Sequence, residues 1–70
     1  MKARFQDVGR QHLTWEADID NTDDLTLCNE IRKHHALASF DVDFHELTDP
    51  RDIQIVVGGL RPVGTIRLLD

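Results

Sequence analysis

The chain has 70 residues and a formal net charge of −5, from thirteen acidic and eight basic side chains. This length predicts a single domain over residues 1–70, and the acidic balance argues against direct binding to nucleic acid, which favours a basic face. The single cysteine excludes an intramolecular disulfide, no apolar run approaches the roughly 18 residues of a membrane span, and residues 1–9 lack the apolar core of a signal peptide. We therefore expect a cytoplasmic protein without a cofactor.

A β-hairpin is predicted at the start of the chain. Residues 2–6 alternate in polarity, with Ala3 and Phe5 on one face, and residues 7–10 predict a turn because their glycine can adopt a positive φ. Residues 13–19 form the clearest strand. Its apolar side chains are Leu13, Trp15, Ala17 and Ile19. These side chains recur at a period of two residues, so the hairpin should present one apolar face.

Residues 21–38 are predicted to form the only helix. Asn21 and Thr22 are good N-caps, and the two aspartates that follow them favour the positive end of the helix macrodipole. At ~100° per residue, the apolar side chains form one stripe, with His34 and His35 at its margins. The stripe consists of Leu27, Cys28, Ile31 and Ala38. A helix this short is marginal alone in water, so the strands must cover the stripe.

Three further strands are predicted after the helix. Residues 40–45 alternate, with Phe40, Val42 and Phe44 directed to the core and Leu47 continuing the apolar set. The later elements are a turn at 48–52, a buried β-branched strand at 53–57, a loop at 58–64 and a last strand at 65–69. The loop is predicted because three glycines and a proline interrupt any strand ladder.

The predicted order of elements is therefore ββαβββ, an α+β fold in which a single helix packs on a mostly antiparallel sheet. This order resembles the β-grasp (ubiquitin-like) fold, which implies a mixed sheet. Ubiquitin-like modifiers end in a Gly-Gly tail that is activated for transfer. This chain ends in Leu68, Leu69 and Asp70, so the resemblance does not extend to conjugation chemistry. A helix on an antiparallel sheet without β-grasp topology stays open.

The sequence gives little support for nucleophilic catalysis. Cys28 lies on the apolar stripe, where a buried thiol behaves as a small hydrophobe, and Ser39 has no nucleophile-elbow motif around it. His34 and His35 are adjacent on a helix and point ~100° apart, so they would not easily share one ion. We therefore predict that the protein is not an enzyme.

The best candidate for a metal site is formed by Asp41, Asp43 and His45, because alternate residues of a strand share one face. A carboxylate and imidazole set can hold a divalent ion. The competing interpretation is a solvated strand face without a fixed second shell of partners, and it is the one we favour. The pair Gly58 and Gly59 lacks the following helix that phosphate-binding loops use.

The distribution of acidic side chains is the most distinctive feature of the sequence. The candidate contact residues for a partner are Glu16, Asp18, Asp20, Asp23, Asp24, Asp41 and Asp43. One interpretation is a set of cross-strand ion pairs with Lys2, Arg4 and Arg67 on a solvated face. The other is a row of negative charge at ~6.8 Å spacing along a strand, which could imitate a stretch of phosphate backbone.

On the second interpretation, the chain is similar in size and acidity to small phage proteins, including anti-CRISPR inhibitors, that block nucleic-acid-binding complexes in the host cytoplasm. We therefore expect a protein-binding inhibitor, monomeric or homodimeric, whose partner is a larger protein with a basic surface. Two alternatives stay open. One is an assembly module that associates with itself through a strand edge, and the other is a small metal-binding protein that uses the candidate site above.

Overall fold

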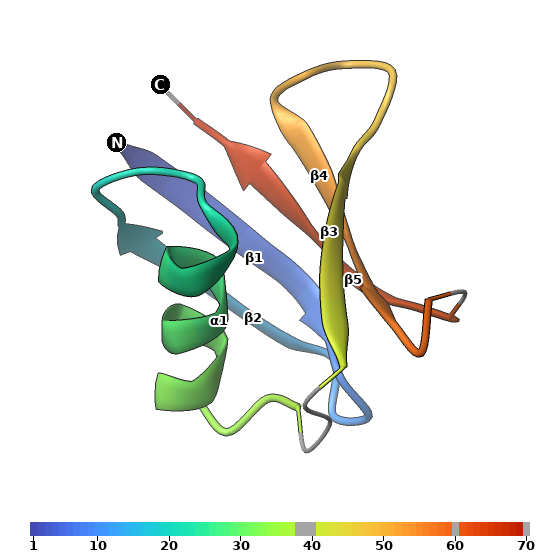
Figure 1. The fold of residues 1–70 in the computed structure, drawn as a ribbon. Helices are drawn as coiled ribbons and strands as arrows, with labels where there is room; N and C mark the ends of the chain where they lie inside the picture. Colours follow the sequence, from blue (N-terminus) through green and yellow to red (C-terminus); the bar gives the residue numbers. More distant parts are fainter. Residues whose placement is uncertain (38–40, 60, 70) are drawn as a thin grey trace.

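The computed structural model describes residues 1–37, 41–59 and 61–69. Five strands and one helix follow one another in the order strand, strand, helix, strand, strand, strand (Figure 1). They are β1 (Lys2–Val8), β2 (Leu13–Asp18), α1 (Asp24–Lys33), β3 (Val42–Glu46), β4 (Asp52–Val57) and β5 (Arg61–Leu68). The predicted ββαβββ order is therefore confirmed.

The five strands form one sheet in the order β2-β1-β5-β4-β3. All four pairings are antiparallel, which confirms the prediction of one helix on a mostly antiparallel sheet. The mixed sheet implied by the β-grasp resemblance is not formed, because β5 runs antiparallel to β1 in the middle of the sheet. Strands β2 and β3 form the two edges of the sheet, so the residues of these two strands lie at opposite edges.

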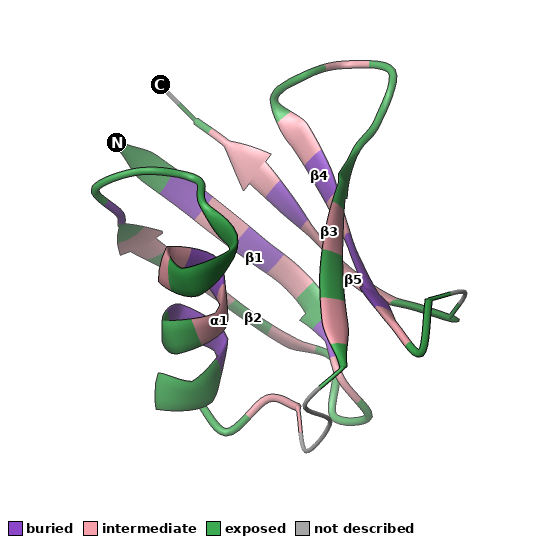
Figure 2. Cartoon of the chain, in the orientation of Figure 1, coloured by how far each residue is buried: buried purple, intermediate pink, exposed green. Residues whose placement is uncertain are grey.

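The hydrophobic core lies between α1 and one face of the sheet. Its largest fully buried side chains are Phe5, Val8, Leu27, Ile55 and Ile66. They come from β1, α1, β4 and β5, and Figure 2 shows buried positions along each of these elements. The sheet is strongly twisted, so β3 turns toward α1 and contacts it (Figure 1). The period-two patterns therefore placed most of the core correctly.

Two predicted core positions need comment. Leu47 is 41% exposed, so the prediction that it continues the apolar set was wrong. It lies just beyond the end of β3, in a turn where its backbone N–H donates to the carbonyl of Asp52. Phe40 lies outside the described residues.

The helix is shorter at both ends than residues 21–38. Its N-cap is Asp23, whose carboxylate accepts a hydrogen bond from the Thr26 backbone N–H at 2.8 Å. Asn21 instead accepts from the Asp23 N–H and shapes the turn before the cap. The helix ends at Lys33, with His34 as its C-cap, and His35 follows with a positive φ of 53° that cannot continue a right-handed helix.

The last strand begins earlier than predicted, at Arg61 rather than at residue 65. Pro62 and Gly64 are accommodated because the register between β4 and β5 shifts between Ile55 and Val56. The extra residue on β5 is Val63, since Pro62 is opposite Val56 and Gly64 is opposite Ile55, and prolines within sheets occur at such bulges. A second register shift interrupts the pairing of β1 and β2 after Phe5.

Candidate functional site

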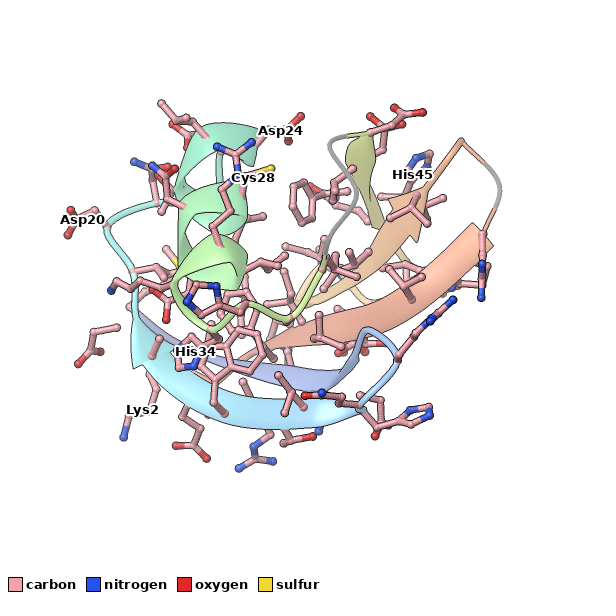
Figure 3. All side chains as sticks on the ribbon, turned by 90° about the horizontal axis from the view of Figure 1, so that it is seen from below. Lys2, Asp20, Asp24, Cys28, His34 and His45 are labelled. Atoms are coloured by element: carbon pink, nitrogen blue, oxygen red, sulfur yellow. The ribbon has the colours of Figure 1, made fainter. Side chains whose placement is uncertain are left out.

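Five of the seven predicted contact residues lie close together in the sequence, between positions 16 and 24. Glu16 and Asp18 lie on the edge strand β2, and the other three lie on the connection to α1 and in its first turn. We call this group the acidic edge. It consists of Glu16, Asp18, Asp20, Asp23 and Asp24, all of which are exposed. In Figure 3 the side chains of Asp20 and Asp24 point away from the body of the protein.

The remaining two candidates lie apart from the acidic edge. Asp43 is on β3, at the opposite edge of the sheet, and Asp41 comes just before this strand. Four strand spacings separate β2 from β3, a path of about 19 Å along the twisted sheet. Within the sheet, three strands therefore lie between Asp43 and the acidic residues of β2.

Ion pairs join neighbouring strands on the solvent face of the sheet. The guanidinium of Arg4 lies 2.9 Å from the carboxylate of Glu16 on the neighbouring strand. Arg67, which is opposite Arg4 on β5, lies 2.8 Å from Asp52. The Arg4–Glu16 pair is exposed and contributes at most about 1 kcal/mol, whereas the Arg67–Asp52 pair is partly buried. The cross-strand interpretation of the sequence therefore applies to Glu16, whose charge is compensated.

The other members of the acidic edge differ from Glu16, because no ion pair with a described residue compensates their charge. Asp18, Asp20 and Asp24 form no ion pair with any of the residues 1–37, 41–59 and 61–69. Hydrogen bonds from the Thr26 side chain and backbone lower the pKa of the Asp23 carboxyl group and so favour its charged form. None of these four carboxylates forms an ion pair with another residue that the structure describes.

Sequence analysis missed a buried carboxylate, Glu30, which is only 8% exposed. It accepts a hydrogen bond from the indole N–H of Trp15 at 3.2 Å. It also lies 3.3 Å from Lys33 Nζ and 3.3 Å from His34 Nε2. Its position three and four residues before a lysine and a histidine was a signal for these contacts. The group anchors α1 to β2, the two elements that carry the acidic edge.

The aromatic rings beside Glu30 strengthen this anchor. Trp15 stacks on Phe5 with ring centroids 4.8 Å apart and an interplanar angle of 4°. His34 stacks on Trp15, with a centroid distance of 4.2 Å. Offset or parallel stacking of this kind adds to the stabilisation from burial. Trp15 is thus held within a stack of three rings at the junction of helix and sheet.

The candidates for chemistry do not converge on a reactive centre. Cys28 is half-buried, and burial raises the pKa of its thiol, which keeps it protonated and unreactive. His34 contacts Glu30, whereas His35 follows the helix in a different backbone conformation. Within the described part of the chain, no three histidine, cysteine or carboxylate side chains lie close enough together to hold a metal ion.

No protein-family model, curated protein or solved structure matches the chain. Within the described residues, no helix has the length and apolar character needed to cross a membrane.

Proposed function

We propose that this protein is a small binding module that docks its acidic edge on a basic surface of a larger protein and so blocks binding of nucleic acid there. The observation that carries the proposal is the group of four exposed carboxylates between positions 18 and 24, which form no ion pair among the described residues. Complementary charge speeds association and selects the partner. A phage-type inhibitor that acts in the host cytoplasm is the concrete form of this proposal.

The acidic edge has the rigidity that such recognition requires. The hydrogen bond from Trp15 to Glu30 ties β2 to α1, and the Asp23 cap fixes the first turn of the helix. The strand end is held as well, because Ile19 and Met1 exchange two backbone hydrogen bonds, of 2.8 and 3.0 Å. A charged surface that is already ordered loses little conformational entropy on binding.

The size of the molecule is compatible with a partner of this kind. A standard protein interface buries about 800 Å² on each side, and the protein exposes 4674 Å² in total. One edge with its flanking turn can therefore supply the interface. Self-association through β2 is less favourable, because pairing two copies would bring the carboxylates of Glu16 and Asp18 near their equivalents.

The test is capture from a nuclease-treated bacterial lysate on the immobilised protein, followed by elution with duplex DNA. Asp20→Lys/Asp24→Lys should abolish capture, because it reverses two charges of the acidic edge. Asp43→Lys/Glu46→Lys is the matched control, since it makes the same charge change on exposed residues at the other edge of the sheet. Equal capture by the wild type and the first variant would contradict the proposal, as would a bound protein that duplex DNA fails to displace.

A further inference from the structure

A half-open cleft of about 900 Å³ lies at the end of the molecule where α1 stops. Three segments enclose it: the turn between β1 and β2, the residues that follow α1, and the adjoining ends of β4 and β5. In Figure 1 these segments meet at the lower end of the molecule, whereas the connection from β2 to α1 lies at the upper end. The cleft is therefore separate from the acidic edge.

The cleft has more basic than acidic lining residues, unlike the protein as a whole. Arg10 and Arg61 line it together with His12 and His35, and Asp7 is its one acidic lining residue. Neither arginine forms an ion pair with any residue in the described part of the chain. In a protein with a net charge of −5, two uncompensated guanidinium groups at one cleft provide a local site for an anion.

The backbone around the cleft holds unusual conformations. Among the described residues, three that are not glycine have a positive φ: Asp7 at 53°, His12 at 51° and His35 at 53°. All three line the cleft. A residue held in this region costs about 1–3 kcal/mol, and such residues cluster at ligand-binding and catalytic sites.

The floor of the cleft is fixed by a close backbone contact. A Cβ atom at Gly9 would collide with the carbonyl oxygen of Ala36. The N–H of the same glycine donates to the carbonyl of Val63 at 2.9 Å. One residue thus joins all three segments, so the arginines are presented from a rigid frame rather than from mobile turns.

We propose that this cleft binds a small organic anion. Arg10 and Arg61 hold its phosphate or carboxylate group, since a guanidinium group matches both oxyanions in shape and charge. Val57, Pro62 and Val63 supply an apolar wall for the rest of the molecule. The volume lies in the range of about 300–1,000 Å³ that is typical of small-molecule sites.

The test is titration of the uniformly ¹⁵N-labelled protein with phenyl phosphate, benzoate and phenol, followed by amide chemical shifts. The three compounds share a ring and differ in the attached group. We expect saturable shifts at Gly9, Arg10, His12 and Arg61 with at least one of the two anions and none with phenol. The tighter of the two anions identifies the oxyanion class.

Three single variants show which arginine side chains contribute to the affinity for the anion. Arg10→Gln and Arg61→Gln should each weaken binding about tenfold or more, because each removes charge-assisted hydrogen bonds. Arg32→Gln is the matched control, since it removes one exposed positive charge from α1 outside the cleft. The amide spectrum of each variant shows whether it is folded.

Three results would overturn the proposal. One is the absence of saturable shifts with both anions, and another is an equal loss of affinity in Arg32→Gln, which would indicate only long-range attraction. The third is binding of phenol as tight as that of the anions. The Asp20→Lys/Asp24→Lys variant should bind the anion at least as tightly as the wild type, so this test is independent of the acidic edge.

Discussion

The two ends of α1 differ in both charge and shape. The acidic edge presents Asp18, Asp20 and Asp24 on an exposed rim, where a large partner can reach them. The cleft at the other end is concave and collects Arg10 and Arg61. A concave surface focuses its field on a small ligand, whereas charges on a rim act on a broad complementary surface. The net charge of −5 conceals this division.

Part of the division follows from the helix itself. Acidic residues are favourable at the start of a helix and basic residues at its end, and α1 has Asp24 in its first turn and Arg32 and Lys33 in its last. The two arginines of the cleft lie in other segments, so the macrodipole does not account for them. The charged residues at the two ends of α1 thus stabilise the helix, whereas Arg10 and Arg61 are available for binding.

The largest effect is expected from Gly9→Ala, which disrupts the packing around the cleft and leaves the acidic edge unchanged. The added methyl group meets the Ala36 carbonyl, and the residue must also hold a φ of 76°. We expect a loss of about 2–4 kcal/mol in the free energy of unfolding, measured by urea denaturation. Gly59→Ala is the control, because it has a similar φ of 78° with no atom near the new methyl group. Equal losses in the two variants would show that the contact at Gly9 is unimportant.

Glu30→Ala should loosen the contact between α1 and β2, which is made from the last turn of the helix. It leaves the indole N–H of Trp15 without its partner, so we expect a loss of about 1–3 kcal/mol in the free energy of unfolding. Glu30→Gln retains an acceptor for the indole and should lose less. Trp15 fluorescence during urea denaturation measures both, and a larger loss in the glutamine variant would contradict the assigned hydrogen bond.

Asp23→Ala should have a smaller effect that depends on pH. The Thr26 hydrogen bonds lower the pKa of Asp23 in the folded protein. The stability that they provide is therefore fully present above the unfolded pKa of about 3.9 and is lost as the pH falls through the lower folded value. We expect the variant to melt a few degrees below the wild type at neutral pH. The two melting curves should converge in strong acid, and a constant difference down to that pH would contradict the cap.

The smallest change in stability is expected from Arg4→Gln. The side chains of Arg4 and Glu16 are 41% and 44% exposed. The free energy of unfolding should therefore change by less than about 1 kcal/mol. The same variant leaves Glu16 uncompensated and should strengthen capture of a basic partner. Unchanged or weaker capture would show that Glu16 lies outside the contact surface.

The sequence predicted the fold better than it predicted the sites. Period-two alternation found β1 because one of its faces is buried, as Phe5 illustrates, and the β-branched run of residues 53–57 found β4, where Ile55 and Val56 are both buried. The end of the helix was missed because His35 adopts a positive φ, and no glycine or proline near it in the sequence indicates a helix end. The start of β5 was missed because a bulge accommodates Pro62. Local propensity does not reveal either feature.

The sites depend on contacts between distant segments. The acidic edge was predicted in part, since residues 16–24 are continuous in sequence, but the separation of Asp43 required the strand order. Compensation of Glu16 by Arg4 was one of two interpretations that the pattern allowed. The cleft could not be predicted, because it forms only where Gly9, Ala36 and Val63 meet.

The central claim is that opposite charges are held at opposite ends of α1. The most direct test maps amide chemical shifts of one labelled sample with two ligands, phenyl phosphate and a short oligolysine peptide. We predict two sets of shifted amides that do not overlap, around Gly9, Arg10 and Arg61 for the anion and across residues 16–24 for the peptide. Shifts from both ligands at the same residues, or none at either end, would contradict the account.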